Sequence, residues 1–191
     1  MGAIVNRVYD DMRNRILRGE FHANSLFVEQ SIATEYDVSR GAAREALQLL
    51  CNAKFLIKHP RKGYFIYNFS DDELREILQA RYFLELGAMG IVVEKCTDGQ
   101  IEALYDTLSG PELQTLPENT VNSSFHLAMA GLSGNQTICE LLRGLLDITA
   151  RKSLNISSAE NKQSHIAIIQ ALLARDMDLC SAALKADLGI Q

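Results

Sequence analysis

The sequence predicts a mainly α-helical protein, in which a small α+β domain is followed by an all-α bundle of six antiparallel helices. Three observations support this fold class. Helical periodicity dominates the 191 residues, and strand-like runs occur only within residues 55–67. Basic residues outnumber acidic ones by ten to seven over residues 1–66, whereas acidic residues outnumber basic ones by seventeen to nine over residues 67–191. A capping serine followed by acidic residues lies where the charge changes sign. We therefore expect two domains, at residues 1–68 and 69–191.

The first domain begins with three predicted helices. An amphipathic stretch covers Val8–Leu17, and a second, short helix covers Glu29–Tyr36. Asp37 suits a tight turn, because aspartate tolerates the left-handed conformation better than most residues. Ser39 then caps a third helix. The apolar positions of this third helix form one stripe: Ala43, Ala46, Leu47 and Leu50.

Helix, tight turn and helix in this order have the layout of a helix-turn-helix. Two strand-like runs, Phe55–Ile57 and Tyr64–Tyr67, follow it and flank a turn that contains Pro60 and Gly63. Such a hairpin forms a wing beside the helix-turn-helix. The first domain is therefore predicted to be a winged helix-turn-helix.

The face opposite the apolar stripe carries the residues expected to meet DNA. At the start of the third helix, where a recognition helix contacts base edges, these are Arg40, Gly41 and Arg44. At the tip of the wing they are Arg61, Lys62 and Gly63. An arginine bonded to guanine contributes about 1–3 kcal/mol of discrimination, and a basic tip can approach a phosphate. Arginines on a helix are also common on solvated faces that bind no DNA, so the pattern alone leaves both interpretations open.

The second domain is predicted to contain helices at residues 71–95, 98–108, 119–132, 135–153, 158–174 and 177–188. Their short connections favour an antiparallel bundle. The longest apolar-plus-glycine stretch, Leu86–Val93, is far shorter than the roughly 18–20 residues of a membrane helix. The N-terminus does not resemble a secretory signal, so we expect a cytoplasmic protein with no membrane partner.

Common enzyme motifs are missing from the sequence. It contains no P-loop, no G-x-G-x-x-G, no G-x-S-x-G and no H-E-x-x-H. The four cysteines form no C-x-x-C, which excludes a zinc knuckle and a dithiol redox motif. We therefore expect that the protein is not an enzyme.

A group of polar residues in the second domain has the spacing of a metal site. Asn122 and His126 lie four residues apart and share a helix face. His165 and Asp187 flank the break at Arg175-Asp176 at nearly equal distances, so an antiparallel hairpin brings them side by side. Two histidines with one or two oxygen ligands suit a divalent metal ion. The same residues could instead be hydrogen-bonded in the core or form a metal-free pocket.

The first domain resembles the GntR-type bacterial transcription regulators. Its segment Val38–Leu47, VSRGAAREAL, is similar to the block V-S-R-T-P-V-R-E-A-L of that family. Phe55–Ile57 and Arg61–Ile66 resemble the family's G-L-V and R-R-G-T-F-V, and Glu29–Ala33 resembles S-E-x-x-L-A. The resemblance implies that Arg40 and Arg44 contact DNA, with Gly63 at the wing tip. The sequence departs from the family where Gly41-Ala42 and Ala23-Asn24 replace Thr-Pro and Pro-Gly.

The second domain resembles the FCD effector domain of the FadR-like GntR subgroup. Phe125–Ala130, followed by Ser133-Gly134-Asn135, is similar to the element D-x-x-F-H-x-x-L…S-G-N. His165–Leu172 resembles H-x-x-I-x-x-A-I, and Arg81–Glu85 resembles R-x-x-L-E. The resemblance implies a helical bundle that binds a small-molecule effector.

In that family an aspartate and three histidines bind a divalent metal, which holds a carboxylate effector together with an arginine. Here Asn122 replaces the aspartate and Asp187 replaces the last histidine. The remaining metal ligands would be His126, His165 and Asp187, a mixed set that suits zinc, nickel, manganese or iron. Arg81 and Asn122 would then contact the effector. Alternatively, Arg81 pairs only with Glu85, and the exchanged residues indicate that the metal has been lost.

Together these features predict a ligand-responsive transcription regulator that acts as a homodimer on a double-stranded operator. A small effector, expected to be a carboxylate, would change the operator affinity through the helical domain. The alternative is a metal-dependent hydrolytic enzyme with a centre at His126, His165 and Asp187. A third possibility is a protein–protein module that reuses the winged fold.

Overall fold

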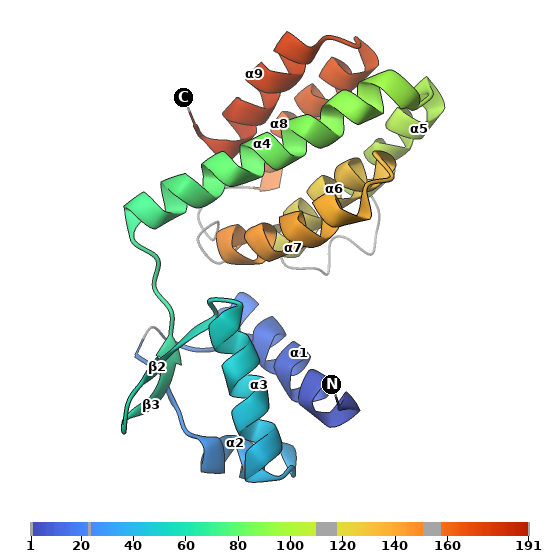
Figure 1. Ribbon diagram of the computed structural model, residues 1–191. Helices are drawn as coiled ribbons and strands as arrows, with labels where there is room; N and C mark the ends of the chain where they lie inside the picture. Colours follow the sequence, from blue (N-terminus) through green and yellow to red (C-terminus); the bar gives the residue numbers. More distant parts are fainter. Residues whose placement is uncertain (1, 23, 110–117, 151–157, 191) are drawn as a thin grey trace. The chain divides into compact units, whose positions relative to one another are not determined.

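The computed structural model describes residues 2–22, 24–109, 118–150 and 158–190. The chain divides into two compact units, Met1–Ser70 and Asp71–Gln191 (Figure 1). Among the described helices, none is long and apolar enough to cross a membrane. The predicted fold class is confirmed: a small winged helix-turn-helix precedes a helical domain.

The first unit contains three helices and a three-stranded antiparallel sheet. Its elements are α1 (Ala3–Leu17), β1 (Leu26–Phe27), α2 (Glu29–Tyr36), α3 (Arg40–Asn52), β2 (Leu56–His59) and β3 (Gly63–Ile66). The strand order is β1-β3-β2, so that β3 lies in the centre and β2–β3 forms the wing. The helix α1 begins five residues earlier than predicted, and its extra turn buries Val5. The strand β1 was not predicted, because two residues carry no alternation and only the pairing with β3 defines them.

Local chemistry sets the start of the recognition helix. Asp37 adopts the left-handed conformation with φ 51°, which turns the chain sharply after α2. The Ser39 hydroxyl accepts a hydrogen bond of 3.1 Å from the Ala42 N–H and caps α3. The predicted apolar stripe of α3 is completely buried, together with side chains from α1 and the wing. This packing fixes which face of α3 remains exposed.

The second unit is entirely helical in its described residues. It consists of α4 (Asp71–Lys95), α5 (Asp98–Glu102), a 3-10 turn η1 (Ala103–Leu108), α6 (Glu118–Leu132), α7 (Gln136–Ala150), α8 (Ser158–Leu173) and α9 (Met177–Leu188). The helix α4 has the predicted bounds. The segment predicted as one helix over 98–108 is divided between α5 and η1, and the predicted end of α7 at residues 151–153 lies outside the described residues.

The long helix α4 packs against α6, α7, α8 and α9 and contributes to the core of the unit (Figure 1). Its C-terminal end is tied to the turn between α8 and α9. Arg175, with φ 57°, donates a hydrogen bond of 2.9 Å to the Val93 carbonyl and one of 2.5 Å to Asp98. The guanidinium also reaches the Val92 carbonyl at 3.4 Å. An arginine thus caps the last turn of α4, where carbonyl groups lack partners within the helix.

Candidate functional site

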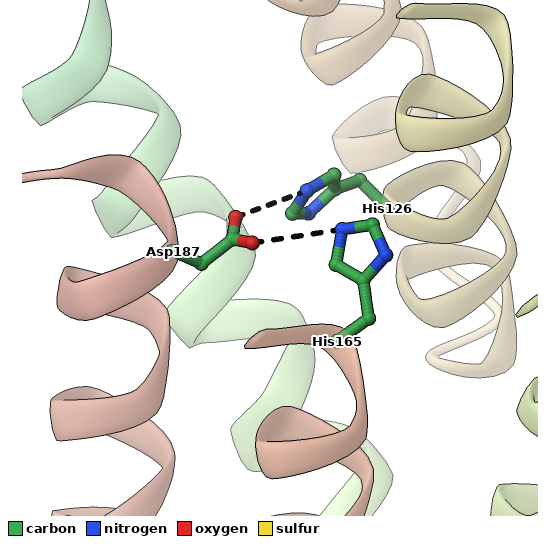
Figure 2. Close-up of side chains that lie close together, drawn as sticks. All are labelled: His126, His165 and Asp187. Carbon is green, nitrogen blue, oxygen red and sulfur yellow. Dashed lines mark ion pairs between the residues drawn. The ribbon is translucent and has the colours of Figure 1, made fainter. Parts of the chain in front are cut away.

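The second unit brings together three of the residues that the sequence singles out. His126 comes from α6, His165 from α8 and Asp187 from α9, and their polar atoms face one another (Figure 2). The distance from His126 Nε2 to Asp187 Oδ2 is 3.2 Å, and that from His165 Nε2 to Asp187 Oδ1 is 3.5 Å. One ligand atom of each residue lies within 4.8 Å of the other two. We call these three residues the His/His/Asp cluster.

Glu85 on α4 is a fourth member of the site, and it was expected only as an ion-pair partner of Arg81. Its Oε2 lies 2.5 Å from His126 Nδ1, and its Oε1 accepts a hydrogen bond of 2.9 Å from Arg81 Nε. Glu85 and His126 are completely buried. The carboxylate therefore holds the His126 ring with Nδ1 protonated, and Nε2 faces the cluster. The spacing of Arg81 and Glu85 indicated their pairing, but the contact with His126 depends on how α4 packs against α6.

Arg81 is buried and joins α4 to α7. Besides its bond to Glu85, its Nη1 donates to the Thr149 hydroxyl at 2.9 Å. Its Nη2 has no hydrogen-bond partner among the described residues. The ion pair with Glu85 is therefore present, and it still leaves one guanidinium nitrogen available to a ligand. Buried donors without a partner are rare in folded proteins.

Asn122, one turn before His126 on α6, contacts His165. Its Oδ1 is 3.0 Å from His165 Nε2, and the ring of His165 stacks on Phe125 at 4.0 Å between centroids. The Ser164 hydroxyl donates to Asp187 Oδ1 at 2.5 Å. These contacts fix the directions of His165 and Asp187, so the cluster is held by its neighbours even without a ligand.

The pKa values show how the charges of the cluster balance. Burial opposes protonation of His126, but the carboxylates of Glu85 and Asp187 raise its pKa to about 9. Burial and the neighbouring His126 lower the pKa of His165 to about 4. Burial favours the neutral acids, yet the charge of His126 keeps the pKa values of Glu85 and Asp187 below their ordinary values. Without a metal, a cationic His126 thus lies between two carboxylates, while His165 is neutral.

The cluster has the donor set of a divalent metal site. Ligands bonded at about 2.1 Å to a common ion lie about 3.0–3.5 Å from one another in tetrahedral or octahedral geometry. The two distances to Asp187, one to each of its carboxylate oxygens, lie in this range, and one ligand atom of each residue lies within 4.8 Å of the other two, so the side chains would draw together around an ion. His126 Nε2 is completely buried and lies 3.2 Å from Asp187 Oδ2, but it does not have the geometry of a hydrogen bond to any described residue. Two imidazoles and one carboxylate suit transition metals, so these residues fit the ion that the sequence suggests.

In the first unit, the predicted DNA-contacting residues lie at the start of α3 and at the tip of the wing. The side chains of Arg40 and Arg44 are 64% and 57% exposed, and both bond to Glu29 at the start of α2. A Cβ added to Gly41 would meet only the Ser39 hydroxyl, at 3.8 Å. Glu29 was expected only as part of the first helix of the motif, and its contacts with α3 cannot be read from local sequence.

The wing tip combines two exposed cations with a structurally required glycine. Arg61 and Lys62 are exposed, and the turn closes with a hydrogen bond of 3.1 Å from the Lys62 N–H to the His59 carbonyl. Gly63 has φ 121°, and a Cβ there would lie 2.7 Å from the Phe27 carbonyl oxygen. The approach of β1 therefore explains this glycine without any contact to DNA.

Two protein-family models match the chain. Residues 4–66 match the model described as bacterial regulatory proteins of the gntR family, and residues 76–189 match the FCD domain. The second match alone covers more than half of the chain.

Relatives among characterised proteins are similar over most of their length. The chain is 27% identical to the Nta operon transcriptional regulator of Aminobacter aminovorans, over 85% of this chain and 80% of that protein. It is 24% identical to the HTH-type transcriptional repressor GlaR of Escherichia coli, over 93% of this chain and 89% of that protein. Among solved structures, McbR/YncC of E. coli has a TM-score of 0.76 at 24% identity and covers 99% of this chain and 95% of that one. The structure of a putative transcriptional regulator GntR from Rhodococcus sp. RHA1 has a TM-score of 0.78 at 22% identity, and the match covers 98% of this chain and 95% of that one.

Proposed function

The chain belongs to the gntR family of bacterial regulatory proteins and carries an FCD domain, and from this premise we propose that a small carboxylate effector controls its affinity for an operator. Members and named relatives are transcriptional regulators, so the prediction that the chain is not an enzyme is confirmed and the hydrolase alternative has no support. The chain is accordingly a DNA-binding transcriptional regulator. The operator contacts, the effector, the metal and the dimer are the parts that we propose.

For the operator, we assign base reading to the start of α3 and phosphate contacts to the wing tip. Arg40 and Arg44 are exposed on the face opposite the buried stripe of α3, which supports their entry into a major groove. Arg61 and Lys62 supply two cations at the tip. One recognition helix reads only a few base pairs, so we infer a homodimer on a palindromic site. Such a regulator acts at the chromosome, which favours the cytoplasm.

For the effector site, His126, His165 and Asp187 would hold a divalent ion. The bound ion would supply a Lewis-acidic anchor for one oxygen of the effector carboxylate. Glu85 would hold the proton of His126 on Nδ1, so that Nε2, which faces the cluster, is the nitrogen that would release its proton and bind the ion. The free Nη2 of Arg81 is suited to the second carboxylate oxygen, and the Asn122 amide to a polar group beside His165. Zinc suits this ligand set, and nickel, manganese and iron suit it as well.

Control would follow from linkage between the two sites. Arg81 and Glu85 lie on α4, the element that begins directly after the first unit. An effector that binds Arg81 would pull on α4, and the chain would transmit the shift to the DNA-binding unit. Because coupling is reciprocal, operator DNA would change the effector affinity by the same factor.

The observation that carries this proposal is the buried His126, with Nδ1 held by Glu85 and Nε2 directed at Asp187 Oδ2, 3.2 Å away, beside His165. The test is elemental analysis of the purified protein beside the variant His126→Ala/His165→Ala. The matched control, His22→Ala/His59→Ala, removes the two histidines of the first unit, which lie outside the cluster. We expect about one divalent ion per wild-type and control chain and none in the cluster variant. Equal metal content in all three proteins would overturn the metal assignment.

The operator assignment has its own test. Wild-type protein and the variant Arg40→Ala/Arg44→Ala each select duplexes from a randomised DNA library. We expect a common sequence motif from the wild type and none from the variant. Selection of the same motif by both proteins would show that other residues read the operator.

A further inference from the structure

Glu29 joins three elements of the first unit at one carboxylate. Arg44 on α3 donates to it twice, from Nε to Oε1 at 2.9 Å and from Nη2 to Oε2 at 2.8 Å. Arg40 donates once, from Nε to Oε2 at 3.2 Å. The hydroxyl of Tyr64, a buried residue of the wing strand β3, lies 3.3 Å from Oε1. The Glu29 side chain is only 13% exposed, although both arginines are largely exposed.

We propose that Glu29 is a positioning residue for base recognition: it fixes the Arg44 guanidinium so that the opposite edge of this group is presented to guanine. This inference rests on the proposed role of Arg44 at the operator. It assigns a specificity-determining function to an acidic residue that would not be expected to touch an anionic ligand.

The donor pattern of Arg44 supports this role. A guanidinium has five N–H donors in one plane, and the bidentate bond to Glu29 uses the edge formed by Nε and Nη2. The other edge, formed by Nη1 and the second N–H of Nη2, remains as an intact fork. This fork has the geometry that matches O6 and N7 of guanine. A side chain held by one edge is thus oriented to read a base with the other.

Arg40 differs from Arg44 in a way that indicates a different role. It has one hydrogen bond to Glu29, which is longer than either bond of Arg44, and its side chain is more exposed. The carboxylate therefore fixes its direction less tightly. A loosely held cation suits a phosphate, which accepts bonds from many directions, better than a base edge. Glu29 thus favours Arg44 as the residue that discriminates between bases.

Glu29 also reduces the affinity for DNA of arbitrary sequence. Two guanidinium groups and one carboxylate leave a local charge of one instead of two at the start of α3. Binding to DNA without sequence preference depends on positive charge at the phosphates. The carboxylate lowers this part of the affinity, while the pre-oriented fork avoids the entropy loss of ordering Arg44 on binding. Both effects increase the ratio of specific to non-specific affinity.

The experiment uses the duplex that the wild-type protein selects from a randomised library. Each G·C pair of this duplex is replaced by A·T in turn, and the loss of affinity is measured for the full chain and its variants. Arg44→Ala identifies the position read by Arg44, because replacement there no longer matters to this variant. Glu29→Gln keeps the size of the side chain and removes its charge. Glu45→Gln removes one charge from an exposed position of the same helix α3 and serves as the matched control.

We expect Glu29→Gln to reduce the discrimination at the Arg44 position about tenfold, while binding to a scrambled duplex stays equal or becomes tighter. Glu45→Gln should keep the wild-type discrimination. The double variant Glu29→Gln/Arg44→Ala should discriminate no worse than Arg44→Ala, because Glu29 acts through Arg44.

The outcomes separate this inference from the proposed function. If Arg44→Ala abolishes discrimination at one position while Glu29→Gln retains it, the role of Glu29 is wrong and the operator assignment stands. If Arg44→Ala changes no position, the operator assignment itself fails. If Glu29→Gln lacks a cooperative unfolding transition, the same discrimination is measured with Glu29→Asp. The shorter aspartate keeps an acidic residue in the first turn of α2, where the helix dipole favours a negative charge, but it is too short to accept both hydrogen bonds from Arg44. Wild-type discrimination by Glu29→Asp would overturn the inference.

Discussion

The Nδ1 atom of His126 lies 2.5 Å from Oε2 of Glu85, and both side chains are completely buried. One carboxylate oxygen therefore holds the proton on Nδ1 and orients the ring, while the other binds Arg81. The position of Glu85 couples the proposed metal ligand to the proposed effector ligand. Removing the charge of Glu85 should disturb both.

We expect Glu85→Gln to weaken metal binding about 10–100-fold, because an amide cannot hold His126 with the same tautomer and basicity. The measurement is a titration of chelator-treated protein with zinc. Glu94→Gln, at an exposed position of the same helix, is the control and should bind zinc like the wild type. An unchanged affinity in Glu85→Gln would contradict the role assigned to this carboxylate.

Arg81→Ala should lower the free energy of unfolding by about 3–5 kcal/mol, because it leaves Glu85 buried without its cationic partner on α4. Urea denaturation measures the change. Arg75→Ala, which removes a guanidinium paired with Asp72 on the surface of α4, should cost about 1 kcal/mol or less. If both substitutions lower the free energy of unfolding by similar amounts, the buried pair of Arg81 and Glu85 contributes no more to stability than a surface ion pair.

Gly63→Ala should lower the free energy of unfolding by about 1–3 kcal/mol, since the new Cβ would lie 2.7 Å from the Phe27 carbonyl oxygen and φ is 121°. Gly41→Ala should instead raise it by about 0.5–1 kcal/mol, because Gly41 is helical and has free space around it. Both changes are measured by urea denaturation. A stable Gly63→Ala protein that loses only DNA affinity would mean that Gly63 serves the DNA contact instead of the sheet.

The stability that Glu29 contributes should disappear at low pH. Hydrogen bonds from Arg44 lower the pKa of Glu29 from its ordinary value of 4.5 to about 2. Because the folded-state pKa is the lower one, this contribution is fully present above about pH 4.5 and is lost as the pH falls toward 2. Unfolding experiments on the wild type and Glu29→Gln between these pH values measure it. A difference between the two proteins that stays constant with pH would contradict this account.

Sequence reasoning predicted most of the fold, because the helices carry clear periodicity and end at capping or breaking residues. It also placed His165 beside Asp187, since counting residues across a helical hairpin requires no tertiary information. The contacts of Glu85 and Glu29 were missed for a common reason. Each carboxylate bonds to side chains on another element, and no local pattern contains such a contact. The strand β1 was missed because its partner strand β3 lies far along the chain.

The contacts of Arg175 restrict how α4 can move. Its guanidinium holds the last carbonyls of this helix and Asp98 at the same time, so the C-terminal end of α4 is fixed to the turn between α8 and α9. A sliding motion along the helix axis would break these bonds, whereas a small rotation about the fixed end would keep them. The displacement produced by such a rotation grows with distance from Arg175. Arg81 and Glu85 lie between this pivot and the N-terminal end of α4. If an effector shifts Arg81 and Glu85 as proposed, the displacement would therefore be larger at the N-terminal end of α4, where the chain continues into the first unit.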